Sequence, residues 1–283
     1  MTVDLKTARV LCIGDVLLEH SVHGTLRLGA GETEPALIIE HEMRRVGGAA
    51  VMFAELAALG AAATLVSVAG NDDAGREIER LMAEGSGGEI HLLVQPNRVT
   101  ARRSRFLAGD RQLLRADHDS ATPLGPYVRE DLLRLARELV TTCGAVVISD
   151  HGKGVLTEGV ALEIIKSARE AGAKAIVAAE GGDPIRYRSA DLLTATRREL
   201  AQATGMPAGS KAAATVAARA LIDRCALGGL LVSEPGAGTM LVEPDGGACV
   251  ETRGGAGIAV IAAGLAIGLS TAAAMRLAAA RLE

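Results

Sequence analysis

Glycines placed just before a predicted helix form the most suggestive chemical pattern in the sequence. Gly254-Gly255-Ala256-Gly257 precedes an alanine-rich stretch. Glycine lets several backbone N–H groups converge on one anion, and the field of a helix N-terminus favours negative charge. The pattern predicts an anion site, although a tight glycine-rich turn explains it at least as well. Gly47-Gly48 also precedes a predicted helix, where close packing against a strand is the alternative.

Polar residues that end two apolar runs form a second group of candidates. Asp15 follows the run 8–13, and Ser149-Asp150 closes the run that begins at residue 145. Such runs are typical of buried strands, so these side chains are expected at strand ends. No Gly-x-Ser-x-Gly elbow surrounds Ser149, and the sequence therefore predicts no hydrolytic triad there.

The residues just beyond Asp150 leave their roles open. Lys153, in Asp-His-Gly-Lys-Gly, fits a phosphate contact and a structural contact equally well. Histidines 118 and 151 flank these segments and are candidates for ligand contact, but a packed or solvated role is more usual. The six histidines show no metal-ligand spacing beyond His20 and His23.

A cationic run lies within a pair of predicted strands at 100–117. Arg102-Arg103-Ser104-Arg105 fits either an anion-binding patch or the solvated face of a strand. Asp117 and Asp119 lie beside Arg115, where a surface ion pair is more usual than a catalytic couple.

The amino-acid composition of the chain limits the classes of function that the protein can have. The chain has 283 residues, 49% of them hydrophobic and 23% charged, with a formal net charge of -4. These values are typical of a globular protein and exclude a disordered chain. Mild acidity without a basic block argues against a nucleic-acid-binding protein, and 1% aromatic residues leave few stacking surfaces. The length suits one large α/β domain with a substantial core.

The cysteines and the chain ends indicate a reducing compartment. No CxxC pair is present, and each cysteine lies in or beside an apolar run, so buried free thiols are expected rather than a disulfide framework or a zinc site. The cysteines are Cys12, Cys143, Cys225 and Cys249. We expect no secretory signal and a cytoplasmic location, because the N-terminus lacks a long apolar stretch.

The uncharged segment 254–275 is long enough to cross a membrane, but it consists mostly of alanine and glycine. It therefore predicts one buried helix, or two helices with a break near Gly268–Ser270, and no membrane partner.

The candidate residues must be positioned by alternating strands and helices. Strands are predicted at 8–13, 63–69, 145–149, 174–178, 190–193 and 229–233, and helices at 47–59, 72–84, 126–142, 158–172 and 211–226. This alternation predicts a mostly parallel sheet covered on both faces. Residues 34–42 and the hairpin around Ala108-Gly109-Asp110 break the alternation and predict a small accessory sheet.

Several of these motifs, in this order and spacing, give the chain its resemblance to a known family. The motifs are Gly14-Asp15-Val16, Gly47-Gly48-Ala49-Ala50, Leu59-Gly60 with Gly70-Asn71-Asp72-Asp73, Gln112 to Asp117, Ser149-Asp150 with Lys153-Gly154, Arg186-Tyr187-Arg188 and Gly255-Ala256-Gly257. The chain resembles ribokinase-like (PfkB-type) carbohydrate kinases, most closely the heptose 7-phosphate kinases of ADP-heptose synthesis.

The resemblance implies a fold, cofactors and a site. The implied fold is a ribokinase-like three-layer α/β/α sandwich, one domain over 1–283, with lid segments at approximately 16–44 and 98–118. ATP, Mg²⁺, a sugar phosphate and a homodimer through the lid are implied as well. The anion hole would be Gly255, Ala256 and Gly257, and Glu199 would be the metal or phosphate residue. The candidate sugar-site residues are Asp15, Gly47, Gly48, Arg115, Asp117, Asp150 and Lys153.

Several positions depart from the family pattern. Ile258 occupies the position of the aspartate that the resemblance makes the general base. An isoleucine can neither accept a proton nor orient a hydroxyl. Thr252 and Gly254 replace the earlier aspartate and threonine of that motif, and Val51 replaces a sugar-binding asparagine. In the first motif the later acid is Glu19, a milder change.

Further departures affect the predicted metal and phosphate residues. Ala178-Ala179-Glu180 replaces Asp-Pro-Lys, and Thr196 replaces the asparagine of Asn-x-x-Glu. Positioning and general-base catalysis supply much of the rate in phosphoryl transfer. We therefore expect a weakly active or inactive kinase homologue, a pseudokinase with a binding or assembly role. The alternative is an active, divergent carbohydrate kinase with a relocated base.

Overall fold

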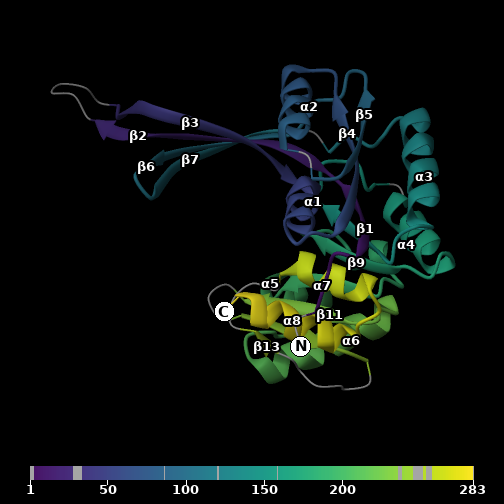
Figure 1. Cartoon of the computed structure of the whole chain (residues 1–283). Helices are drawn as coiled ribbons and strands as arrows, with labels where there is room; N and C mark the ends of the chain where they lie inside the picture. The colour runs from purple at the N-terminus through teal and green to yellow at the C-terminus, as the bar shows by residue number, and fades with distance from the viewer. Residues whose placement is uncertain are drawn as a thin grey trace.

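A computed structural model gives the architecture of the chain (Figure 1). The structure describes residues 3–27, 34–85, 87–119, 121–157, 159–234, 238–244, 251–252 and 257–282.

A nine-stranded sheet forms the centre of the molecule, in the order β13-β12-β11-β10-β9-β8-β1-β4-β5. Neighbouring strands run parallel, except that β12 is antiparallel to both β11 and β13. The strands are β1 (Arg9–Gly14), β4 (Ala62–Gly70), β5 (Glu89–Gln95), β8 (Ala145–Asp150), β9 (Lys174–Ala179), β10 (Leu192–Thr196), β11 (Leu230–Glu234), β12 (Gly238–Val242) and β13 (Glu251–Thr252).

Helices cover both faces of this sheet, which confirms the predicted α/β/α sandwich. One apolar layer joins the sheet to α3, α4, α5 and α6, and a second joins it to α1, α2, α7 and α8. The helices are α1 (Ala49–Ala58), α2 (Asp73–Gly85), α3 (Pro126–Val140), α4 (Val160–Glu170), α5 (Arg197–Thr204), α6 (Lys211–Cys225), α7 (Ile258–Ala266) and α8 (Thr271–Leu282), with a 3₁₀ turn η1 (Pro184–Tyr187).

A separate four-stranded sheet projects from the main body (Figure 1). Its order is β3-β2-β6-β7, with β2 parallel to β6 and antiparallel to β3. The strands are β2 (Val16–Arg27), β3 (Ala36–Gly48), β6 (Arg102–Ala108) and β7 (Arg111–His118). Gly109, with φ 56°, makes the hairpin turn predicted between β6 and β7. Motion of this small sheet as a lid, and the one-domain division, stay predictions.

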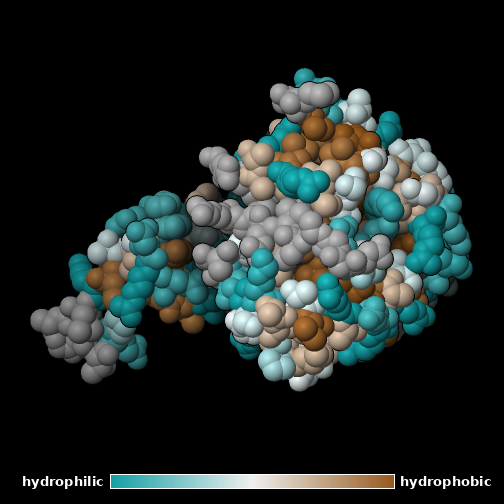
Figure 2. All heavy atoms as spheres, turned by 90° about the horizontal axis from the view of Figure 1, so that it is seen from below, coloured by the Kyte–Doolittle hydropathy of each residue, from teal (hydrophilic) through white to brown (hydrophobic). Residues whose placement is uncertain are grey.

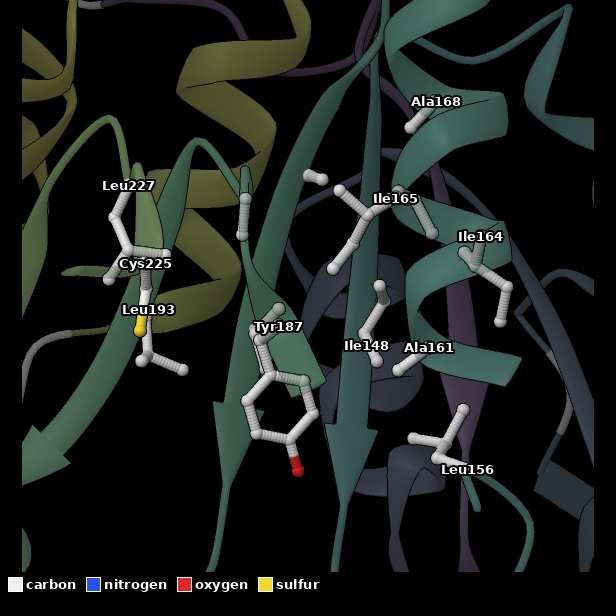
Figure 3. Packing of buried hydrophobic residues seen from close by; sticks show 14 of the residues in the cluster. Ile148, Leu156, Ala161, Ile164, Ile165, Ala168, Tyr187, Leu193, Cys225 and Leu227 are labelled. Carbon is white, nitrogen blue, oxygen red and sulfur yellow. The ribbon is translucent and has the colours of Figure 1, made fainter. Parts of the chain in front are cut away.

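The core is built mainly from aliphatic residues, as the low aromatic content requires, and Phe53 and Tyr187 are its buried aromatic residues in the described part of the chain. Figure 3 shows Tyr187 beside Ile148 and Leu193, with its hydroxyl pointing toward the ends of the strands. The hydroxyl donates to the Oδ2 of Asp150 at 2.7 Å. A buried hydroxyl of this kind needs a partner, and it ties the core to the polar residues at the strand ends.

The alanine-rich C-terminal segment is two helices, as predicted. The break lies between α7 and α8, where Gly268 adopts φ 88°. Within the described part of the chain, no helix is long and apolar enough to cross a membrane. Cys12 and Cys225 are buried free thiols and Cys143 is partly buried, while Cys249 lies outside the described residues. Burial raises the pKa of Cys12, which keeps this thiol protonated.

Five strands and helices were absent from the sequence-based prediction, namely β2, β5, β12, β13 and α5. Strand β5 is an edge strand with a mixed burial pattern, and β2 continues into the small sheet with one face exposed. Neither shows the continuous apolar run of a central strand. Helix α5 has only eight residues. Its capping box, with Thr196 and Glu199 at Ncap and N3, was the signal that could have identified it.

Candidate functional site

The carboxyl ends of β1 and β8 meet at one edge of the main sheet, and Asp15 lies between them. Its side chain is fully buried. Oδ2 accepts hydrogen bonds from the backbone N–H of His151 at 2.9 Å and of Lys153 at 3.1 Å, and Oδ1 accepts from Val155 at 3.1 Å. Burial raises the pKa of Asp15, the Asp150 charge adds to this, and the three N–H donors oppose it. Asp15 therefore holds the 151–155 loop in place.

Two glycines allow the backbone to pass close to Asp15. A side chain on Gly14 would collide with the Ser149 carbonyl oxygen, and one on Gly48 with the Asp15 carbonyl oxygen. Gly48 also adopts φ 72°, a conformation that favours glycine, just before α1 begins. Close packing, the alternative considered for the glycine pair, is therefore what Gly48 provides. Gly47 lies at the end of β3 and faces Glu19.

Asp150 is the second buried carboxylate at this edge, with 4% of its surface exposed. Its Oδ1 accepts from the Gly152 N–H at 2.8 Å, and its Oδ2 accepts from Arg186 at 3.1 Å and from the Tyr187 hydroxyl at 2.7 Å. Burial and the Asp150 charge raise the pKa of Tyr187. The carboxylate thus joins β8 to η1, and its oxygens are engaged within the chain.

Lys153 connects this edge to the small sheet, because its Nζ forms an ion pair with Asp119, just beyond β7. Asp117 pairs with Arg115, as expected, through Nε at 3.0 Å, and with Arg103 at 3.5 Å. Register places these residues on one face of the small sheet, because Arg103 pairs with Asp117 and Arg105 with Arg115. The structure thus brings the small-sheet candidates within electrostatic reach of the main-sheet edge.

Glu19 lies on the same face, next to β6 through its register partner Arg103. It accepts from Arg45 at 2.7 Å and lies 3.6 Å from Arg105. Arginines exceed acids on this face: Arg45, Arg103, Arg105 and Arg115 stand against Glu19 and Asp117. Such a surplus of guanidinium groups suits an anionic ligand.

Glu199, the metal or phosphate candidate, is engaged inside the chain. Its Oε2 accepts from the Thr196 N–H and hydroxyl, both at 2.8 Å, and its Oε1 accepts from the Gly181 N–H at 3.1 Å. Thr196 in turn caps α5 by accepting from the Glu199 N–H. A capping box satisfies orphan amides at a helix start. Glu199 therefore has a structural role here.

Helix α7 begins at the same edge of the sheet. Its last residue, Ala266, lies against Gly144, which directly precedes β8, so its first residue, Ile258, lies toward the carboxyl end of β8. Ile258 is partly buried and packs on the apolar layer. No described side chain caps the first turn after Gly257. The other predicted anion-hole residues, Gly255 and Ala256, lie outside the described residues. So does Gly254, which replaces the threonine of the family motif.

Three further polar groups at this edge form an arrangement that the sequence-based prediction missed. The Oγ of Ser149 lies 3.1 Å from Nε2 of His151, and Nδ1 of His151 lies 3.0 Å from Oε1 of Glu180. Glu180 directly follows β9, the neighbour of β8. Ser-x-His was visible in the sequence, but an acid 29 positions after the histidine could be placed only by the parallel strand pairing.

A cavity of about 480 Å³ opens between η1, α5 and α6. It lies on the face of the main sheet that α3, α4, α5 and α6 cover. Its wall includes the Tyr187 ring, Leu193, Gln202 and Arg224. Glu199 and Gly181 border it, so a ligand there would contact the capped start of α5. The cavity is large enough for a small metabolite.

Comparison with known proteins identifies the family. The model of the pfkB family carbohydrate kinases matches residues 7–280. The chain is 40% identical over 243 residues to the bifunctional protein HldE of Paramagnetospirillum magneticum, and 39% identical over 286 residues to that of Rhodospirillum rubrum. These matches cover 86% and 97% of this chain but only 50% and 58% of the relatives, so the chain spans little more than half of their length.

Solved structures agree on the fold. Arabidopsis thaliana ribokinase complexed with ribose and ATP superposes with a TM-score of 0.72 at 22% identity, covering 97% of this chain and 90% of that one. Escherichia coli phosphofructokinase-2 in complex with fructose-6-phosphate gives 0.77 at 17% identity, covering 97% and 91%. The chain therefore belongs to the pfkB family of carbohydrate kinases.

Proposed function

We propose that this protein binds a nucleotide and a sugar phosphate and transfers the phosphoryl group weakly or not at all. The observation that carries the proposal is Ile258, the first residue of α7, at the strand edge where Asp15 and Asp150 lie. By the family resemblance this position holds the general base. A hydrocarbon side chain accepts no proton, and general-base catalysis is worth about 10²–10⁴-fold in rate.

Two further positions support weak transfer. Ala178, opposite Ser149 in the β8–β9 register, offers only a methyl group. Glu199 accepts three hydrogen bonds from its own chain. Within the described ranges, no three His, Cys, Asp or Glu side chains gather as a metal site requires. The described residues therefore do not form a site for a resident Mg²⁺, and we propose that an ion would arrive with the nucleotide.

Anion binding is supported at two places, the start of α7 and the arginine-rich face of the small sheet. The first-turn amides of α7 point toward the strand edge, and a helix N-terminus favours phosphate. The arginine-rich face of the small sheet would meet the phosphate of a sugar phosphate. The heptose 7-phosphates are the first ligands to test, because the resemblance is strongest to their kinases.

Charge removal on the small sheet tests the sugar-phosphate part of the proposal. Arg105→Gln should raise the Kd for the sugar phosphate about tenfold, since losing one charge-assisted hydrogen bond costs about 1.5–3 kcal/mol. Arg102→Gln is the matched control, because Arg102 alternates to the opposite face of β6. Equal affinities of the two variants by calorimetry would contradict binding at this face.

A second copy of the chain is the proposed partner of the small sheet. Hydrophobic side chains are exposed there (Figure 2), with Ile39, Met43 and Leu114 each more than half exposed. Ile39 and Met43 lie on β3 and Leu114 on β7, the two outer strands of the small sheet, and exposed hydrophobic side chains at such strands suit an interaction surface. Leu114→Arg should convert a dimer to a monomer in sedimentation experiments. Val216→Arg on α6, at 56% exposure, should leave the mass unchanged. If the wild type sediments as a monomer, the proposal that a second copy of the chain is the partner is wrong.

The nucleotide part is tested by calorimetric titration with Mg-ATP. Saturable binding is expected. Absence of binding at millimolar nucleotide would reject the proposal and leave an assembly role. The second candidate function is an active divergent kinase, favoured by the convergence of Asp15, Asp150 and Lys153 at the strand edge. Measurable sugar-dependent ATP turnover by the wild type would select it.

A further inference from the structure

Ser149, His151 and Glu180 lie in the order hydroxyl, imidazole and carboxylate, and the contact between His151 and Glu180 is a close ion pair without hydrogen-bond geometry. The Ser149 Oγ is 3.1 Å from Nε2 of His151, and Nδ1 of His151 is 3.0 Å from Oε1 of Glu180. Backbone hydrogen bonds hold the parts in register: His151 N–H donates to Asp15 at 2.9 Å, and Glu180 N–H donates to the Asp150 carbonyl at 2.8 Å. The arrangement therefore rests on the buried framework of the strand edge.

The charges of the group define the direction of proton transfer. The His151 imidazole lowers the pKa of Glu180, so this carboxyl is ionised at neutral pH. An ionised carboxylate beside Nδ1 favours the tautomer with its proton on that nitrogen. Nε2 then presents its lone pair to the Ser149 hydroxyl. Serine hydrolases use the same atoms in the same order, on several unrelated folds.

A small side chain and a helix N-terminus lie near Ser149. Ser149 is 3% exposed, but its register neighbour Ala178 in β9 carries only a methyl group and is partly exposed. Ser149 lies on the same face of β8 as Val147, two residues earlier, and Val147 packs in the apolar layer shared with α7. The N-terminus of α7 therefore lies on the face and at the edge where Ser149 sits. Its first-turn amides have the orientation that stabilises an oxyanion.

We propose that Ser149 is a nucleophile, that His151 is its base and Glu180 its positioning residue, and that the group catalyses acyl transfer from a small anionic carboxylic ester. The anionic preference follows from Arg103 and Lys153, whose charges reach Glu180. This activity goes beyond the proposed nucleotide and sugar-phosphate binding and does not depend on it.

The step balances without a further reagent. Ser149 Oγ bonds to the ester carbonyl carbon while its proton moves to Nε2 of His151. The carbon–alkoxy bond then breaks, and the leaving alcohol takes the proton from His151. Water next attacks the carbonyl carbon of the acyl-serine and gives one proton to Nε2 of His151. The bond between this carbon and the Ser149 Oγ then breaks, and Oγ takes the proton back from His151. The products are one acid and one alcohol.

A fluorophosphonate probe tests the nucleophile directly, with the intact protein. Ser149 would displace fluoride and gain one phosphonyl adduct, located by peptide mass spectrometry. Ser149→Ala should carry no adduct at this peptide. His151→Gln should slow labelling at least about a hundredfold, and Glu180→Gln by a smaller factor of at least about ten, since both remove parts of the relay.

Matched controls separate activation from folding. His91→Gln alters a histidine that likewise lies near a glutamate, 2.9 Å from Glu89, but on β5. Its labelling rate should equal that of the wild type. Ester turnover with a nitrophenyl succinate should follow the order of the labelling rates. No adduct at Ser149 in the folded wild type, or equal rates in the wild type and His151→Gln, would overturn the proposal.

Discussion

The carboxyl edge of the main sheet and the face of the small sheet are both rich in charge, but they use it differently. At the edge, Asp15 and Asp150 are 0% and 4% exposed, and each accepts three hydrogen bonds from its own chain. On the small sheet, Arg115 and Asp117 form an ion pair with side chains 45% and 29% exposed.

The difference separates framework from ligand contact. A buried carboxylate with every partner inside the chain cannot exchange them for a ligand without leaving buried N–H groups unpaired. An exposed ion pair exchanges partners at little cost. Asp15 and Asp150, two of the acids that the family resemblance marks as sugar-site candidates, therefore maintain the loop geometry, and the arginines of the small sheet remain available to an anion.

Asp15→Ala is the change expected to have the largest effect. It removes the acceptor of three buried N–H groups of the 151–155 loop, and each unpaired buried donor is costly. The free energy of unfolding should fall by about 2–4 kcal/mol, as measured by urea denaturation. Asp73→Ala, at a fully exposed carboxylate on α2, is the control and should be near neutral. Equal free energies of unfolding for Asp15→Ala and Asp73→Ala would contradict the distinction between the two regions.

Tyr187→Phe tests the framework at Asp150. The change removes only the hydroxyl that donates to Asp150 at 2.7 Å. Unfolding free energy should fall by about 1–2 kcal/mol, because a buried carboxylate loses one donor. Tyr127→Phe serves as the matched control, since Tyr127 is 86% exposed. A neutral Tyr187→Phe would show that Asp150 is adequately satisfied by Arg186 and Gly152.

Asp72, at the junction of the two regions, should have an intermediate effect that depends on pH. Burial acts to raise its pKa, but hydrogen bonds from Thr100 and Gly75 outweigh this and lower the pKa. A lowered pKa stabilises the fold above the unfolded value, about 4, and this contribution disappears as pH falls through the folded value.

Asp72→Asn should therefore cost about 1 kcal/mol at neutral pH and nothing in strong acid. Denaturant midpoints at several pH values measure the difference. A cost that stays constant across the titration would assign the effect to packing alone.

Arg115→Ala should have the smallest effect on stability, below about 0.5 kcal/mol, because the pair that it breaks is exposed. The same variant should weaken sugar-phosphate binding several-fold in calorimetry. A large loss of stability would place the small sheet in the framework instead.

Most of the fold could be predicted from the sequence, because central parallel strands and amphipathic helices have clear periodicities. The runs that became β1, β8 and β9 are apolar except at their ends, and the break between α7 and α8 coincides with Gly268. Strand β2 was missed because only five of its twelve residues are buried, so it lacks a continuous apolar run. Its pairing with β6 is a long-range contact that no local sequence pattern indicates.

The site was less predictable. Asp15 was identified as a candidate from the sequence. Only the loop geometry shows that its carboxylate oxygens accept hydrogen bonds from three backbone amides. Glu199 carries a motif whose helix-capping use and metal-binding use have the same sequence signature. The Ser149–His151–Glu180 group depends on two adjacent parallel strands, a neighbour relation that one sequence does not encode locally.

The measurement that tests the central claim most directly is sugar-dependent ATP turnover by the wild type and by Ile258→Asp, assayed side by side with heptose 7-phosphate. We predict turnover at background for the wild type. We predict an increase of about 10²-fold in the variant, the usual worth of a positioned general base. Wild-type turnover within the kinase range of about 1–100 s⁻¹, unchanged or lowered by the substitution, would contradict the account.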